Sequence, residues 1–186
     1  MPPAATPPFC PPHQIGANEV VLIGTFWYSD GMTETFMRAA IRLSRAKMRA
    51  NCGGPFGAVV VRHGKIVGRG WNQVTSLCDP TAHAEIAAIR AACQRLRTFR
   101  LEDCELYTSC EPCPMCLAAI YWARIKEVYY ANTRQDAAAI EFDDELIYRE
   151  MVKPVAKRKI PMHALLRSEA LEVFAEWKIK PDKIRY

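Results

Sequence analysis

The chain has 186 residues, of which 50% are apolar, and this length and composition suit one globular domain with a full core. Its formal net charge of +5 at pH 7 permits an anionic ligand or nucleic acid but requires neither. No stretch approaches the roughly 20 apolar residues of a membrane-spanning helix, so a membrane partner is not expected.

The eight cysteines are an even number, which is compatible with a disulfide framework. That interpretation needs a secretory signal, and the N-terminal region has neither the basic segment nor the long apolar segment of one. We therefore expect a cytoplasmic protein in a reducing compartment. One metal site should use some of the cysteines, and most of the others should be buried as small apolar residues.

The N-terminal part of the chain differs in composition from the rest. Six prolines occupy the first twelve positions, and proline favours extended, solvated backbone over helices and sheets. Residues 1–30 are therefore predicted to be a proline-rich N-terminal extension, in which the apolar run Glu19–Phe26 forms a strand or another ordered segment. Residues 31–186 are predicted to form the one functional domain.

Apolar residues at intervals of three and four predict helices, and short apolar runs between turn signals predict strands. The expected helices are Gly31–Ala50, a second one from within Asp79–His83 to Arg95, Pro114–Arg124, Phe142–Met151 and Ser168–Trp177. The expected strands are Ala58–Arg62, Ile66–Trp71, Cys104–Thr108, Glu127–Ala131 and Ile160–Leu166. The first two strands form a hairpin, after which strands alternate with helices. This order predicts an α/β fold, a three-layer α/β/α sandwich with a mixed five-stranded sheet.

Two short motifs carry the chemistry. His83-Ala84-Glu85 stands at the expected start of the second helix, and Pro112-Cys113-Pro114-Met115-Cys116 opens the third helix, its first cysteine thirty residues after the histidine. One histidine and two cysteines are ligands suited to Zn2+, and catalytic zinc characteristically has three protein ligands and an open position for water. Helix N-termini favour the thiolate form of the cysteines. Asp79 or Thr81 is expected to cap the second helix, with Pro80 in its first turn.

The alternative is a structural zinc site, which is closed by a fourth ligand. The one candidate is Cys110, three residues before Cys113, and we expect it to belong to the end of a strand instead. The pattern H-x-E…P-C-x-x-C is the signature of the zinc nucleobase deaminases. In such a site, zinc-activated hydroxide attacks a ring carbon bonded to an exocyclic amine. Glu85 is then the residue that carries the proton of the water to the ring nitrogen.

Three segments resemble the cytidine deaminase-like superfamily, namely Gly54–Ala58, Asp79–Glu85 and Thr108–Cys116. Within that superfamily, Ile120–Arg124 and Phe142-Asp143-Asp144 are similar to the small bacterial zinc-dependent guanine deaminases. The resemblance covers the chain from about residue 33 to its end. It implies a zinc-dependent deaminase domain that hydrolyses guanine to xanthine and ammonia, with one Zn2+ per chain and a small purine base as its partner.

The resemblance also implies roles for individual residues. The implied zinc ligands are His83, Cys113 and Cys116. Glu85 is the implied proton shuttle, and Asp144 is the implied second acid, which protonates the departing amine. Glu141 is the alternative to Asp144. The residues alone would place Asp143-Asp144-Glu145 at a helix N-terminus that acidic side chains stabilise.

The substrate-binding residues implied by the resemblance are Asn72, Phe56, Ala84, Trp122 and Tyr186. Without the resemblance, Asn72 would be a turn residue, Phe56 a buried loop residue and Trp122 a core residue. Tyr186 is implied to close the pocket of the partner subunit through an exchanged C-terminal segment, which predicts a homodimer.

Three other functions remain compatible with the motifs. A guanosine deaminase also carries the Phe-Asp-Asp motif, and only a pocket with room for the ribose would distinguish it. A tRNA adenosine deaminase shares the zinc motifs, but Phe142-Asp143-Asp144 and the absence of a strongly basic stretch argue against a nucleic-acid partner. A cytosine-type base has less support. The non-enzymatic alternative is a zinc-stapled interaction module that uses the proline-rich extension.

Overall fold

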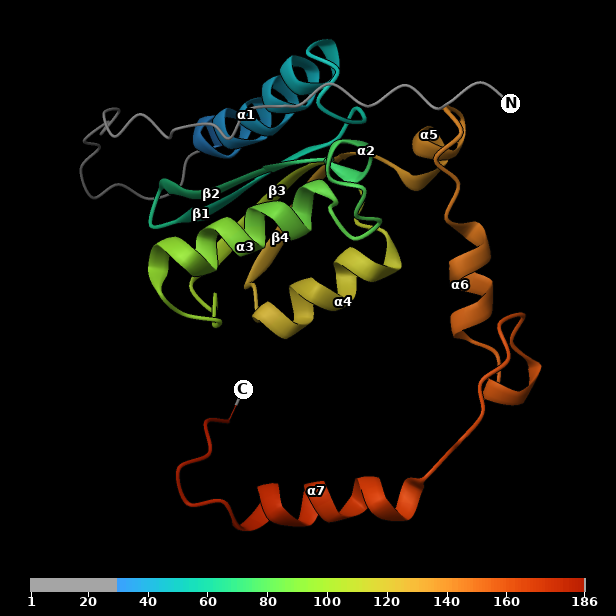
Figure 1. Ribbon diagram of the computed structural model, residues 1–186. Coiled ribbons are helices and arrows are strands. Elements are labelled where there is room, and N and C mark those ends of the chain that lie inside the picture. Colours follow the sequence, from blue (N-terminus) through green and yellow to red (C-terminus); the bar gives the residue numbers. More distant parts are fainter. Residues whose placement is uncertain (1–29, 186) are drawn as a thin grey trace. The chain divides into compact units, whose positions relative to one another are not determined.

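The computed structural model describes residues 30–185, and the structural statements below concern that part of the chain. The segment Glu19–Phe26 and the terminal Tyr186 lie outside the described residues. The chain divides into two compact units, Met1–Asp144 and Glu145–Tyr186, which are described in turn (Figure 1).

The first unit contains a mixed four-stranded sheet. Its strands are β1 (Gly57–Arg62), β2 (Lys65–Trp71), β3 (Cys104–Cys110) and β4 (Glu127–Asn132). The strand order is β2-β1-β3-β4, with β1 antiparallel to both β2 and β3, and β3 parallel to β4. The predicted hairpin and the mixed sheet are therefore confirmed.

Helices cover both faces of this sheet. The helices of the first unit are α1 (Asp30–Arg49), α2 (Val74–Leu77), α3 (Ala84–Leu96), α4 (Pro114–Ala123) and α5 (Arg134–Ala138). Helix α1 lies on one face of the sheet, and α3 and α4 lie on the other (Figure 1). This arrangement confirms the predicted three-layer α/β/α sandwich.

Two apolar cores separate the three layers. Val59 and Val61 of β1 pack with Phe36 of α1, whereas Val60 packs in the larger core with residues of α3 and α4. Successive residues of a strand point to opposite faces, so a strand covered on both sides reads as a continuous apolar run. Burial on both faces therefore explains the continuous apolar run Ala58–Val61.

The close packing of α3 on β2 depends on two glycines. A Cβ at Gly70 would overlap the carbonyl oxygen of Ala84 and the amide nitrogen of Ala88, and a Cβ at Gly68 would overlap the carbonyl oxygen of Ala88. Only a residue without a side chain permits this approach of backbone to backbone. The first turn of α3 is thereby held directly against the sheet.

The start of α3 differs from the prediction. The Asp79 Oδ1 atom accepts hydrogen bonds from the backbone N–H (2.8 Å) and the hydroxyl (2.6 Å) of Thr81, so these residues form a turn that includes Pro80 and do not cap the helix. His83 is the N-cap, and the helix begins at Ala84. The expected cap at Asp79 or Thr81 and the position of Pro80 in the helix were therefore wrong.

The helix predicted at Phe142–Met151 also begins later, as α6 (Glu145–Met151). The backbone N–H of Phe142 donates to the carbonyl oxygen of Ala137 (3.0 Å), and Glu141 has φ of +72°. These features are a Schellman closure of α5, which turns the chain away from helix. Phe142-Asp143-Asp144 therefore forms an irregular segment between two helices.

The second unit contains α6, the 3-10 helix η1 (Val155–Lys157) and α7 (Arg167–Ile179). The fifth strand, predicted at Ile160–Leu166, was wrong because no strand is present in residues 145–185. Pro161 has no backbone donor, and every residue of that run is exposed, so no neighbouring strand completes a ladder. None of the described residues of this unit is buried, and Phe174 and Trp177 are among its exposed apolar side chains. None of the helices between residues 30 and 185 combines the length and the apolar character needed to cross a membrane.

Candidate metal centre and active site

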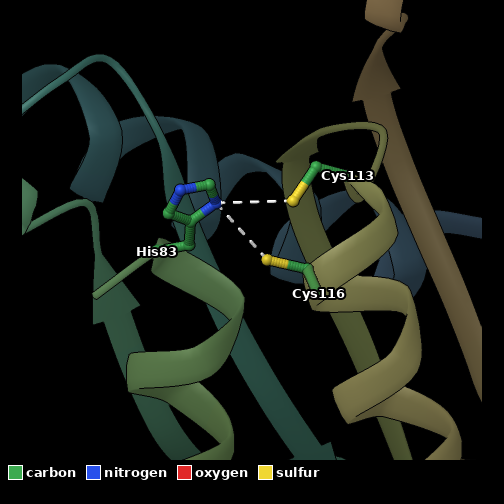
Figure 2. A group of neighbouring side chains, drawn as sticks. All are labelled: His83, Cys113 and Cys116. Carbon is green, nitrogen blue, oxygen red and sulfur yellow. Dashed lines mark hydrogen bonds between the residues drawn. The ribbon is translucent and has the colours of Figure 1, made fainter. Parts of the chain in front are cut away.

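Two helix N-termini bring the three predicted metal ligands together. His83 is the N-cap of α3, Cys113 is the N-cap of α4, and Cys116 lies in the first turn of α4. Their ligand atoms all lie within 4.8 Å of one another. The His83 Nδ1 atom lies 3.6 Å from the Cys113 Sγ atom and 3.5 Å from the Cys116 Sγ atom (Figure 2).

These distances fit a tetrahedral zinc ion. With Zn–S distances of about 2.3 Å and Zn–N distances of about 2.0–2.1 Å, tetrahedral angles separate a nitrogen ligand from a sulfur ligand by about 3.6 Å. The two separations observed from the His83 Nδ1 atom are close to that value. One imidazole and two thiols are also the donor types that zinc prefers, so the residues present fit this metal.

The electrostatics of the three side chains favour a thiolate. A hydrogen bond from the Cys116 thiol, together with one from His83, lowers the pKa of Cys113 to about 4. The hydrogen bond to Cys113 in turn raises the pKa of His83. Cys116 is the more deeply buried of the two cysteines and lies beside the Glu85 carboxyl group, so the thiolate of the pair forms first at Cys113.

The structure separates Cys110 from this group. Cys110 is the last residue of β3, and its Sγ atom donates to the carbonyl oxygen of Thr133 at 3.5 Å. It is not among the ligand atoms that lie within 4.8 Å of one another. The geometry therefore provides three protein ligands from the described residues, as a catalytic zinc site requires, and not the four of a closed structural site.

Glu85 is buried next to the three ligands and is only 6% exposed. Its Oε1 atom accepts a hydrogen bond of 3.2 Å from the hydroxyl of Thr108, and its Oε2 atom lies 3.5 Å from the Cys116 Sγ atom. Burial raises the pKa of Glu85, because desolvation disfavours the charged carboxylate. One carboxyl oxygen is thus fixed to the sheet, and the other faces the metal ligands.

Asn72 and Phe56 belong to one hydrogen-bonded loop system. The Asn72 Oδ1 atom accepts from the backbone N–H groups of Gly54 (3.4 Å) and Val74 (3.3 Å). The Asn72 backbone N–H donates to the carbonyl oxygen of Phe56 at 3.1 Å. Because the oxygen of the Asn72 amide is occupied by backbone donors, its NH2 group is the part that remains to meet a ligand.

Asp144 lies near the ligand group, whereas Glu141 is on the surface. Burial raises the pKa of Asp144 above its usual range, and the negative charge of Cys113 is the second cause of this increase. Phe142, two residues before Asp144, packs edge-on against Phe56 with ring centroids 4.9 Å apart. This aromatic pair links the Phe142-Asp143-Asp144 segment to the loop that contains Phe56.

Three further residues were predicted to bind the substrate, namely Ala84, Trp122 and Tyr186. Ala84 is fully buried at the first position of α3, directly after His83. Trp122 lies on α4 and is 69% exposed, so the interpretation of Trp122 as a core residue was wrong. Tyr186 lies outside the described residues.

Sequence reasoning assigned no role to Thr108 or Ser109, both of which are buried near these groups. Thr108 donates to Glu85, and the Ser109 hydroxyl accepts from the backbone N–H of Gly57 at 3.0 Å. Their signal in the sequence was two hydroxyl side chains in succession near the end of a mostly buried strand. A buried hydroxyl requires a hydrogen-bond partner, but the sequence does not reveal which partner.

A three-layer α/β/α fold, with a His/Cys/Cys group at two helix N-termini and a buried glutamate beside it, defines the class of zinc-dependent nucleobase deaminases. Comparison with known families supports this classification. The chain belongs to the family of the cytidine and deoxycytidylate deaminase zinc-binding region, whose sequence pattern matches residues 31–132.

Several relatives of the chain have known activities or structures. Guanine deaminase of Bacillus subtilis (strain 168) is 51% identical over 153 residues, which are 82% of this chain and 98% of that protein. The X-ray structure of guanine deaminase from Bacillus subtilis matches with a TM-score of 0.80 over 82% of this chain and 98% of its own. A guanine deaminase structure from Nitrosomonas europaea matches at 32% identity, with a TM-score of 0.57, over 69% and 79% of the two chains. A tRNA-specific adenosine deaminase of Aquifex aeolicus is 34% identical over 77% of this chain and 92% of its own length.

Removing a metal ligand and replacing Glu85, the predicted proton shuttle, should have different effects. We expect Cys113→Ala to lose bound zinc and activity together, because two protein ligands hold the ion poorly. Glu85→Gln should keep its zinc and lose turnover, because the amide cannot accept the proton of water. Metal analysis of the purified variants, alongside ammonia release, measures both effects. A Glu85→Gln variant that keeps most of its rate would show that Glu85 is not the proton shuttle.

Proposed function

We propose that this protein hydrolyses guanine to xanthine and ammonia. The observation that carries the proposal is the buried Glu85 beside the His83/Cys113/Cys116 group, because these side chains together are suited to activating water. The choice of guanine is supported by the 51% identity to the Bacillus subtilis guanine deaminase, nearly all of whose length aligns with this chain.

Water is the nucleophile, the ligand group holds the zinc ion that activates it, and Glu85 moves its proton. When bound by His83, Cys113 and Cys116, Zn2+ lowers the pKa of water towards about 7. Glu85 takes a proton from the attacking water at its Oε2 atom, which faces the ligands, and delivers it to the ring nitrogen beside the attacked carbon. The new carbon–oxygen bond forms on the carbon that carries the exocyclic amine.

Asp144 is the proposed acid for the leaving group. An exocyclic amine leaves poorly until it is protonated, and Glu85 has already given the proton of the water to the ring nitrogen. The raised pKa of Asp144 keeps part of this carboxyl group protonated at a higher pH than usual, which suits a proton donor. Cleavage of the carbon–nitrogen bond then releases ammonia, and the proton of the new hydroxyl group passes to the Asp144 carboxylate as the carbonyl of xanthine forms.

Asn72, Phe56 and Ala84 are the proposed contacts of the purine ring. The Asn72 NH2 group is left to donate to the base, because its oxygen already holds two backbone N–H groups. Phe56 supplies an aromatic face that Phe142 supports from the edge. Trp122 and Tyr186 complete the proposed set on the basis of the resemblance alone.

The substrate is tested by measuring ammonia release from guanine, guanosine, adenine, cytosine and a tRNA anticodon stem-loop. We expect guanine to have the highest kcat/KM of the five. Preference for guanosine, or for the stem-loop, would replace guanine deamination by the corresponding nucleoside or tRNA activity. Zinc-loaded protein that hydrolyses none of the five would support the zinc-stapled interaction module.

Replacing the second acid should slow the reaction without removing the metal. Asp144→Asn is expected to keep the fold and the zinc while kcat falls by roughly 10²–10⁴, the range for loss of a general acid. Glu141→Gln is the matched control, because Glu141 is exposed on the same segment. Steady-state kinetics on guanine compares the two variants. If the Glu141 variant is the slow one and the Asp144 variant is close to the unmodified protein, Glu141 has the role.

We further propose that the protein is a cytoplasmic homodimer. In the second unit none of residues 145–185 is buried, and its exposed apolar side chains include Phe174 (71%) and Trp177 (44%). Large exposed apolar surfaces mark sites of association, and a second copy of the chain is the proposed partner. Of the cysteines between residues 30 and 185, two are proposed zinc ligands, and Cys52, Cys104 and Cys110 are buried, which supports the use of cysteine as ligand and as small apolar residue in a reducing compartment.

The exchange of C-terminal segments between subunits is tested by deletion. Removal of Asp182–Tyr186 should leave zinc content and thermal unfolding nearly unchanged while activity on guanine collapses. Mixing the deletion variant with Glu85→Gln should restore part of the activity, because some heterodimers combine an intact Glu85 site with an intact partner tail. Two variants that stay inactive after proven subunit exchange would show that the tail does not act on the partner's site.

A further inference from the structure

The end of β3 carries two buried hydroxyl side chains that bind different parts of the proposed active site. Thr108 and Ser109 are 1% and 5% exposed. Because they are consecutive residues of one strand, their side chains leave the strand in different directions. Thr108 binds the proton shuttle Glu85, and Ser109 binds the backbone of Gly57, which directly follows Phe56.

The contact of Thr108 orients the carboxyl group of Glu85. The two side chains are brought together from β3 and α3, and the hydroxyl donates to the Oε1 atom at 3.2 Å. The Oε2 atom then faces Cys116 at 3.5 Å. Without this hydrogen bond, the Glu85 carboxyl group could rotate about its side-chain bonds. The hydrogen bond therefore determines that the Oε2 atom, and not the Oε1 atom, is the one that serves the water.

The contact of Ser109 fixes the end of the loop that holds the purine contacts. Its hydroxyl oxygen accepts from the Gly57 N–H at 3.0 Å. The loop is further closed by the Phe56 N–H, which donates to the carbonyl oxygen of Gly54 (2.8 Å), and by the Asn72 N–H, which donates to that of Phe56 (3.1 Å). Loss of the Ser109 hydroxyl would leave a buried backbone donor without a partner and would free this end of the loop.

We propose that Thr108 and Ser109 are positioning residues with separate tasks, Thr108 for the proton transfer by Glu85 and Ser109 for the binding of the purine by the Phe56 loop. This inference rests on the proposed deamination of guanine. Neither residue is assigned a contact with the substrate or with the metal. The separation of tasks follows from the two hydrogen bonds, which lead to two different elements.

Thr108→Val removes the hydroxyl and keeps the shape of the side chain. Its kcat on guanine should fall by about 10- to 100-fold, the range for a lost hydrogen bond to a charged group, with KM within about threefold of the unmodified protein. Thr108→Ser keeps the hydroxyl and should retain most of kcat. If Thr108→Val does not fold, Thr108→Ala replaces it in the comparison with Thr108→Ser. Variants without the hydroxyl are expected to lose activity, and the variant that keeps it is expected to retain activity.

Ser109→Ala should have the complementary effect. The KM for guanine is expected to rise by about 3- to 10-fold, the range for a neutral hydrogen bond, while kcat changes less. Calorimetric binding of the product xanthine gives a readout that is independent of turnover. The Kd for xanthine should rise in Ser109→Ala and should stay unchanged in Thr108→Val. Zinc content should remain one ion per chain in all variants.

The results separate this inference from the function on which it rests. If the unmodified zinc-loaded protein does not deaminate guanine, the proposed function fails. If it does and Thr108→Val matches it in kcat, or if Thr108→Ser loses as much activity as Thr108→Val, the role of Thr108 is overturned. Equal losses of kcat and of xanthine affinity in the Thr108 and Ser109 variants would show a common structural effect and would overturn the separate tasks.

Discussion

The close approach of two helix N-termini to each other is the constraint on which the site depends. His83 and Cys113 are the N-caps of these helices, and the ligand atoms of His83, Cys113 and Cys116 gather within 4.8 Å. Gly70 makes this possible for α3, because a side chain there would push the first turn away from the sheet. The negative charges of the Cys113 thiolate and the Glu85 carboxylate repel each other, so a cation bound by the ligand group would stabilise the arrangement. Metal binding and folding of this region are therefore linked.

Strand β3 connects this ligand group to the rest of the proposed active site. The last three residues of β3 and the residue that follows them bind four different partners: Thr108 binds Glu85, Ser109 binds Gly57, Cys110 binds Thr133 and Glu111 binds the backbone of Arg134. These contacts reach α3, the Phe56 loop and the start of α5, the helix that leads to Asp144. The residues that are proposed to act on one substrate from several elements thus share one support, as precise positioning requires.

The sequence predicted the features that depend on local spacing. The His83 and Cys113 motifs each place their ligands within one turn at a helix start, and the apolar periodicity identified the four strands that form. Non-local features were not visible in this way. The run Ile160–Leu166 had strand-like composition but no partner strand, and the Asp79–Thr81 turn uses the same residue types as a helix cap. The contacts of Thr108 and Ser109 span 23 and 52 residues, and only the folded chain brings these pairs together.

The proposed catalysis depends on three protein ligands that hold zinc and leave one position open for water. X-ray absorption at the zinc edge of the purified protein tests this most directly. We expect two sulfur ligands at about 2.3 Å, one histidine nitrogen at about 2.0–2.1 Å and one further oxygen ligand from solvent. A shell of three sulfur atoms and one nitrogen would mean that Cys110 or another cysteine closes the site. That result would contradict the catalytic role of the metal centre.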